Sequence, residues 1–212
     1  MNRSLSLSRA GRTVYASPLL TLFAAAVFVI PGADIALRYV VDATPSDAWR
    51  FVASHWVHWS FEHLLWSGGA FLLLGWVCEA RGRIRFLATT LAAALTIPLA
   101  LRLAQPGLEH YGGLSGLDSA LFGLLCMQDI RMHWRSPSRR WLAAPLLLLM
   151  GFLGKIGYEF ATGAAVFVSH TDAMVPVPLA HLVGAAVGII AALDVQRVFL
   201  WEKDAFRVEF AI

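Results

Sequence analysis

Six apolar runs follow one another along the chain, separated by short polar connectors. They lie at 18–37, 58–79, 86–104, 115–130, 141–165 and 178–200. Because a helix needs about 20 apolar residues to cross a bilayer, this pattern predicts an all-α, polytopic membrane protein with six transmembrane helices. Residues 1–17 then form an N-terminal segment, 18–200 the membrane domain, and 201–212 a C-terminal tail.

The composition agrees with a membrane protein. Hydrophobic residues make up 58% of the 212 positions and charged residues only 15%, far from the usual soluble mixture. Cys78 and Cys126 lie inside apolar runs without metal-ligand spacing, so neither a zinc site nor a disulfide framework is expected. The first run follows three arginines and could be a signal peptide, but no cleavage site is evident, which favours a retained helix.

The basic residues indicate the topology. Most of the 17 Lys and Arg residues lie before the first run, in alternate connectors, or after the sixth run. Positively charged connectors stay in the cytoplasm, so both termini are predicted to be cytoplasmic. The net charge of +3 therefore reports membrane orientation, and a nucleic-acid partner is not expected.

This topology brings three polar groups to one depth. The second, fourth and sixth runs begin at the outer face and carry His63, Ser115 and His181 in their first turns. Polar groups at membrane depth are costly and commonly line a polar cavity. A single buried histidine is more often a packing residue, but three groups in one layer favour a site.

Ser115 lies where a glycine-rich turn becomes a helix, between Gly113 and Gly116. The unpaired N–H groups of a helix N-terminus could stabilise an oxyanion formed when a serine attacks a carbonyl. Taken alone, Gly-Leu-Ser-Gly is a weak motif, because such turns usually only begin a helix.

Small residues predict that the fourth and sixth helices pack closely. They form the stripes Ala180, Gly184, Gly188 and Ala192 on one helix and Gly116, Ala120 and Gly123 on the other. Small residues at this spacing let helices approach in lipid, which would bring His181 towards Ser115.

These motifs resemble the rhomboid family of intramembrane serine proteases over about residues 49–190. The resemblance is carried by Trp49-Arg50, by His58-Trp59-Ser60-Phe61-Glu62-His63, by Glu79, by Gly113-Leu114-Ser115-Gly116 and by Ala180-His181-Leu182-Val183-Gly184 with Gly188. The chain is most similar to the compact rhombosortase branch. That resemblance implies the bacterial inner membrane and single-span substrates with a C-terminal Gly-Gly motif, a membrane helix and a basic tail.

The resemblance also implies roles at the site. Ser115 would be the nucleophile and His181 the general base, while His63 and the Ser115 N–H would hold the oxyanion. Two positions depart from the family. Ser67 stands where Asn is common, and Ser119 where Tyr usually packs against the base. Ser67 could still donate one hydrogen bond to the oxyanion. No cofactor or metal is implied.

Three further residues leave alternatives open. Asp118 is either a carboxyl hydrogen-bonded for folding or a group that orients His181. Lys155 and Glu159 are spaced to pair on one helix, either as a structural ion pair or as part of a substrate cavity in a helix thinned by glycines. Beyond a protease, the sequence leaves room for an inactive rhomboid-like chaperone, and less readily for a small transporter.

Overall fold

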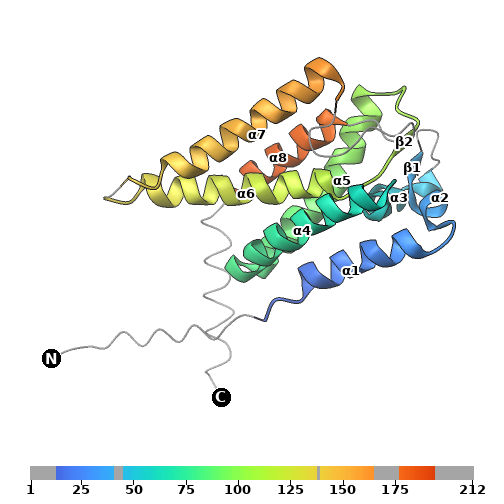
Figure 1. The fold of residues 1–212 in the computed structure, drawn as a ribbon, viewed down its shortest axis with the longest axis horizontal. Coiled ribbons are helices and arrows are strands. Elements are labelled where there is room, and N and C mark those ends of the chain that lie inside the picture. The colour runs from blue at the N-terminus through green and yellow to red at the C-terminus, as the bar shows by residue number, and fades with distance from the viewer. Residues whose placement is uncertain (1–12, 41–44, 138, 165–176, 194–212) are drawn as a thin grey trace.

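The computed structural model describes residues 13–40, 45–137, 139–164 and 177–193, and this part of the protein is mostly helical (Figure 1). The main helices are α1 (Ala16–Val29), α4 (Phe61–Arg81), α5 (Arg83–Ala104), α6 (Ser115–Trp134), α7 (Ala143–Thr162) and α8 (Pro178–Leu193). Short elements are α2 (Ala33–Leu37), α3 (Arg50–Ala53), the 3-10 turns Pro45–Asp47 and Ser54–Trp56, and strands β1 (Tyr39–Val40) and β2 (His110–Tyr111).

Five of the six predicted runs correspond to one helix each, but the first does not. The run 18–37 is divided into α1 and α2. Ile30 is extended, as expected for a residue before Pro31, and Gly32 turns the chain with φ +77. The prediction of one continuous helix over 18–37 is therefore wrong. The sixth run, 178–200, extends beyond α8 into residues outside the described part.

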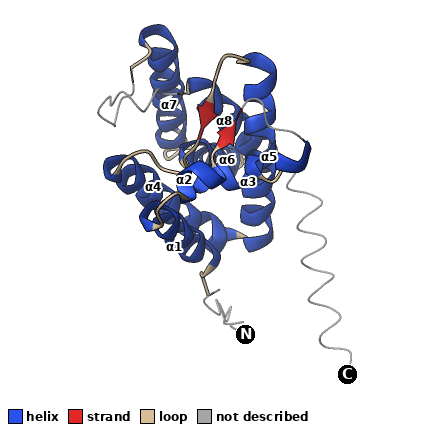
Figure 2. Cartoon of the chain, turned by 90° about the vertical axis from the view of Figure 1, so that its right-hand side faces the viewer, coloured by secondary structure: helices blue, strands red, loops and turns tan. Residues whose placement is uncertain are grey.

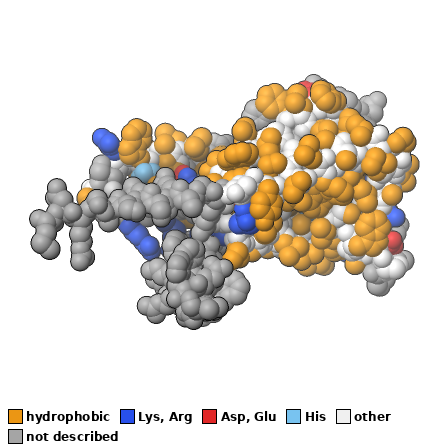
Figure 3. All heavy atoms as spheres, turned by 90° about the horizontal axis from the view of Figure 1, so that it is seen from below, with side chains coloured by type: hydrophobic (Ala, Val, Ile, Leu, Met, Phe, Trp, Pro, Cys, Tyr) orange, Lys and Arg blue, Asp and Glu red, His pale blue; other side chains and the backbone are white. Residues whose placement is uncertain are grey.

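Three of the described helices, α4, α5 and α7, are long and apolar enough to cross a membrane. Helices α1 and α8 are apolar but shorter. Helix α6 has 20 residues and carries Asp118, Asp129 and Arg131. Six spans therefore remain a prediction, while an apolar helical bundle is established. Its surface suits lipid: Leu73 and Leu147 are 70% and 71% exposed, and apolar side chains cover much of the described face in Figure 3.

Helix α6 is the centre of the bundle and packs against α4, α5, α7 and α8. Its first half is buried almost all round, with Leu117 and Leu121 fully inaccessible. Helix α7 lies at the edge of the bundle (Figure 1), and its buried residues are Pro145, Ile156 and Glu159. A buried glutamate on an otherwise exposed helix is unusual, because burying a charge is costly unless it is paired.

The predicted contact between the small-residue stripes of α6 and α8 is confirmed. A Cβ atom added to Gly184 would overlap the carbonyl oxygen of Gly116, and one added to Gly188 would overlap that of Ala120. These two contacts advance along both helices in the same direction, so α6 and α8 run parallel. Their first turns, which carry Ser115 and His181, therefore lie at the same end of the bundle.

The loops of that end are joined by a two-stranded antiparallel sheet. β1 pairs with β2, with Tyr39 opposite Tyr111, and both strands lie beside the start of α6 when the bundle is viewed end-on (Figure 2). Tyr39 is fully buried and Tyr111 is 3% exposed. The sheet fixes the chain just before the glycine-rich turn that leads into Ser115.

Candidate active site

Ser115 is the first residue of α6 and is half-buried. The preceding Gly113 has φ +120, a conformation that side-chain-bearing residues rarely adopt. The residue before the helix, Leu114, provides no side-chain cap, and the first amides of a helix have no carbonyl partner within it. Ser115 thus combines a hydroxyl with free backbone donors at one helix end.

His63 from α4 lies directly against this turn. A Cβ added to Gly113 would be 2.7 Å from His63 Cε1 and 2.9 Å from Nε2. The ring is therefore held beside the chain two residues before Ser115, and only glycine leaves room for it. His63 is 6% exposed, and its backbone N–H donates a hydrogen bond to the Ser60 hydroxyl oxygen at 3.1 Å. The family resemblance had paired His63 with Ser115, and the structure brings their segments together.

A second histidine, His58, supports both segments. Its Nδ1 lies 3.1 Å from the Trp56 carbonyl oxygen, so Nδ1 carries the proton, because a carbonyl can only accept. Nε2 is then an acceptor, 3.5 Å from the Leu114 N–H and 3.0 Å from Ser67 Oγ. Burial lowers the pKa of His58 to about 3, with the nearby charge of His63 acting in the same direction. His58 is therefore neutral at ordinary pH.

Ser67, the residue in place of the family's usual Asn, is bonded within this network. Its hydroxyl lies 3.0 Å from the His63 carbonyl oxygen as well as from His58 Nε2. One hydroxyl proton is thus shared between two acceptors. Ser119, in place of the usual Tyr, donates to the Ser115 carbonyl at 2.7 Å, and its Cβ would be 3.2 Å from a Cβ on Gly184. A small residue at 119 lets α8 approach.

His181 lies on the face of α8 that meets α6 and α7. It is 8% exposed, and its Nδ1 is 2.9 Å from Glu159 Oε2 and 3.2 Å from Lys155 Nζ. Lys155 and Glu159 also form the predicted ion pair, at 2.8 Å. Within the described residues no hydrogen bond joins His181 to Ser115, although the packing of α6 and α8 places them in facing turns.

The chain matches one known protein family over the residues of this site. The model of the rhomboid domain matches residues 45–197, most of the chain and all four segments that carry Ser115, His181, His63 and Glu159. The chain belongs to the rhomboid family. Members of this family are generally intramembrane serine proteases, and the apolar helices agree with an integral membrane protein.

One curated relative is similar to this rhomboid chain. It is Rhomboid-related protein 1 of Caenorhabditis elegans, 27% identical over 147 residues. The match covers 68% of this chain but only 38% of the relative. The likeness therefore concerns the rhomboid domain, and the relative's remaining length has no counterpart in the match.

Asp118 is close to this rhomboid site but is not bonded to His181. It is 9% exposed, and its Oδ1 is buried without a hydrogen-bond partner among the described residues. The sequence left open whether Asp118 orients the base. In the structure, His181 Nδ1 contacts the carboxylate of Glu159 and not that of Asp118.

Two buried histidines, His55 and His58, support the site, although the sequence motifs assign neither of them a role in it. His55 is fully buried, with Nε2 3.1 Å from the Ala94 carbonyl and Nδ1 3.4 Å from the Tyr111 hydroxyl. Burial lowers the pKa of His55 to about 4. Their position after the Trp-Arg loop was the available signal, but burial of a loop is not visible in sequence.

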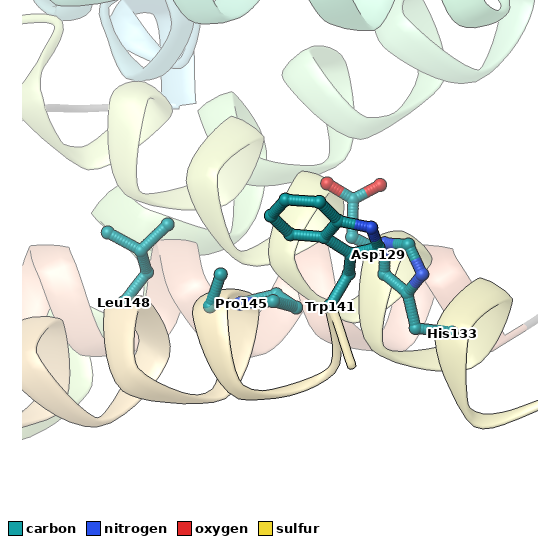
Figure 4. Close-up of a pocket in the computed structure, with 6 residues that line it drawn as sticks. Asp129, His133, Trp141, Pro145 and Leu148 are labelled. Carbon is teal, nitrogen blue, oxygen red and sulfur yellow. The ribbon is translucent and has the colours of Figure 1, made fainter. Parts of the chain in front are cut away.

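Two pockets are found in the described part of the protein. One, of about 400 Å³, is lined by Asp129, His133, Trp141, Ala144, Pro145 and Leu148 (Figure 4). Asp129 is 14 residues after Ser115, about 21 Å along α6 at 1.5 Å per residue, so this pocket is remote from the site. The other, of about 230 Å³, extends from the end of α1 to His58. No group of His, Cys, Asp and Glu suited to a metal occurs in the described ranges.

Proposed function

We propose that this rhomboid-family protein is an intramembrane serine endopeptidase in which Ser115 is the nucleophile and His181 the general base. The observation that supports it best is the glycine-mediated packing of α6 against α8, which sets the turns bearing Ser115 and His181 beside each other. Catalytic hydrogen bonds are often longer before substrate binds, so the lack of a Ser115–His181 hydrogen bond among the described residues is compatible with this role.

The reaction proceeds by acyl transfer. Ser115 Oγ attacks the carbonyl carbon of the scissile peptide as its proton passes to His181 Nε2. The C–N bond then breaks, and His181 returns that proton to the leaving amine. Water attacks the acyl ester, gives a proton to His181, and the proton passes back to Ser115 Oγ as the carboxylic acid leaves. No cofactor takes part.

The oxyanion is held by the Ser115 N–H and by the ring of His63, which lies against the turn that leads into Ser115. Ser67 helps to position His63 by joining this turn of α4 to His58 through a hydrogen bond. It is also the third group that we propose to donate a hydrogen bond to the oxyanion. The small Ser119 lets α8 pack closely against α6. This close packing holds the base in place of the contact that the family's usual Tyr would make with it.

The substrates we propose are single-span membrane proteins with a C-terminal Gly-Gly motif, as in the rhombosortase branch. The enzyme then has six spans, lies in the bacterial inner membrane with both termini in the cytoplasm, and acts near the outer leaflet. Lys155 and Glu159 lie beside the base on the helix that borders lipid, where a substrate segment would pass.

The experiment uses purified full-length protein in detergent. Wild type should react with a fluorophosphonate probe and cleave a Gly-Gly-tailed membrane substrate, whereas Ser115→Ala and His181→Ala should do neither while remaining folded. A folded wild type that does not react with the probe would overturn the protease assignment in favour of an inactive rhomboid-like protein. Probe reaction without cleavage would retain the protease and reject the Gly-Gly substrate class.

A further inference from the structure

The two charged residues of α7 meet His181 in one buried cluster. Glu159 has 2% of its side chain exposed, Lys155 19% and His181 10%. Glu159 uses both oxygens: Oε2 is 2.9 Å from His181 Nδ1, and Oε1 is 2.8 Å from Lys155 Nζ. The carboxylate thus bridges an ammonium and an imidazole across the α7–α8 contact.

We propose that Glu159 is a positioning residue that holds the proton of His181 on Nδ1, so that Nε2 is the atom free to accept the Ser115 proton. This inference rests on the proposed function, in which Ser115 and His181 perform the chemistry. It makes the site a Ser-His-Glu arrangement whose acid comes from the fifth of the predicted membrane helices.

The contacts of His181 Nδ1 decide where the ring proton lies. An ionised carboxylate can only accept, so a 2.9 Å contact with Glu159 requires a proton on Nδ1. Lys155 Nζ is 3.2 Å from the same nitrogen, but an ammonium also only donates. If Lys155 held Nδ1 instead, the ring proton would be on Nε2 and the base would be blocked. Glu159 opposes this arrangement, because its Oε2 lies closer to Nδ1, at 2.9 Å, than Lys155 Nζ does, at 3.2 Å, and this contact needs a proton on Nδ1.

The charges around His181 agree with this role. Lys155 and Glu159 contact it from α7, while Asp118 on α6 and His63 on α4 are close enough for their charges to interact with Lys155 and His181 respectively. The Lys155–Glu159 pair is neutral overall, so the resting imidazole needs no counter-ion. When His181 takes the Ser115 proton, Glu159 is in contact with the resulting imidazolium and stabilises it, and the Nδ1 proton stays on the ring.

The competing explanation is that Lys155 and Glu159 form an ion pair that serves only folding. The two explanations predict different results when one or both charges are removed. If Lys155 and Glu159 serve only folding, the double variant Lys155→Met/Glu159→Gln should recover the labelling rate that Glu159→Gln alone loses, because it leaves no unpaired charge. If Glu159 positions the base, the double variant should be as slow as Glu159→Gln, since neither has a carboxylate at Nδ1.

The first test measures the fluorophosphonate labelling rate of full-length wild type, Glu159→Gln, Glu159→Asp and Lys155→Met/Glu159→Gln, with thermal unfolding recorded for each. We expect Glu159→Gln and the double variant to label about 100-fold or more slowly than wild type, by analogy with loss of the acid in serine proteases. Glu159→Asp should recover part of the rate. Glu109→Gln, in an exposed loop, is the matched control for losing one carboxylate. Wild-type labelling by Glu159→Gln, or recovery in the double variant, would overturn the proposal.

The second test reads the tautomer without any activity. Nitrogen-15 NMR of histidine-labelled wild type, with the His181 signals identified by their loss in His181→Gln, should show a protonated Nδ1 and an unprotonated Nε2. The opposite tautomer would overturn the proposal even if every Glu159 variant failed to fold. An unreactive wild type with the expected tautomer would instead reject the protease assignment and leave the hydrogen-bonding role of Glu159 in place.

Discussion

The carboxylate of Glu79, near the end of α4, caps the N-terminus of α1 by accepting hydrogen bonds from Ser17. Its Oε2 accepts hydrogen bonds from the Ser17 N–H at 2.9 Å and the Ser17 hydroxyl at 3.1 Å, and its Oε1 accepts from the N–H groups of Tyr15 and Ala16. The free amides at the start of α1 are therefore satisfied by a side chain 62 residues further along the chain.

Glu79→Gln should destabilise the protein, because an amide group replaces an acceptor-only carboxylate that is 1% exposed. Hydrogen bonds to charged groups contribute about 1.5–3 kcal/mol, and we expect a loss of that order, measured by thermal unfolding in detergent. Glu109→Gln, on an exposed loop, should be close to neutral. Equal unfolding temperatures for both variants would show that the Glu79 cap contributes nothing measurable.

The glycines of α8 and α7 should respond in opposite ways to an added methyl group. In Gly188→Ala the new Cβ would overlap the Ala120 carbonyl, so the helices must separate. Overpacking costs about 1–3 kcal/mol, occasionally more, and separation would also move His181 from Ser115. In Gly154→Ala the new Cβ would meet nothing within 4 Å, and alanine favours a helix.

Unfolding temperature and probe labelling should therefore both fall in Gly188→Ala and hold or improve in Gly154→Ala. Preserved labelling in Gly188→Ala would contradict the view that close packing of α6 and α8 aligns the site.

Much of the fold follows from local sequence patterns. The apolar runs predicted α4 to α7 and the start of α8 to within a few residues, because each is bounded by polar or glycine-containing connectors. The small-residue stripes predicted the α6–α8 contact, since glycine at every fourth position has few other uses in a membrane helix. The run 18–37 failed because its apolar character continues through Pro31, where the backbone cannot remain helical.

The environment of His181 could not be predicted in the same way. The pairing of Lys155 with Glu159 follows from their spacing on one helix, and it is confirmed at 2.8 Å. Their contact with His181 depends on how α7 is rotated against α8, and α7 has few buried residues to reveal that rotation. The burial of His55 and His58 likewise depends on loops that fold back onto the bundle.

Acid should destabilise the folded protein partly through His58. Burial lowers its pKa from 6.5 to about 3 in the folded state, so between these values the unfolded chain binds a proton that the folded protein does not. The free energy of unfolding must then fall as pH falls through this window. We expect the unfolding temperature to drop between pH 7 and pH 4, and to drop less steeply in His58→Gln.

The matched control is His110→Gln, which removes an imidazole from an exposed position. An identical pH dependence in wild type and His58→Gln would mean that His58 does not stay neutral on folding.

Gly113→Ala should slow the proposed reaction without removing any proposed catalytic group. The position has φ +120, and the new methyl would lie 2.7 Å from the His63 ring, so either the turn or the ring must move. We expect probe labelling to fall at least about tenfold, because oxyanion donors act only when accurately placed. Gly107→Ala, in a loop where an added Cβ meets nothing within 4 Å, is the control. Normal labelling of Gly113→Ala would argue against a role for His63 at the oxyanion.

The proposed orientation can be tested with single cysteines, because Cys78 and Cys126 are both buried. Glu109 lies in the loop before β2, at the Ser115 end of α6, whereas Arg139 lies in the basic connector between α6 and α7, and both are exposed. Positively charged connectors remain in the cytoplasm. A membrane-impermeant maleimide should therefore label Glu109→Cys in intact cells and Arg139→Cys only after lysis. The reverse pattern would place Ser115 at the cytoplasmic face and contradict cleavage near the outer leaflet.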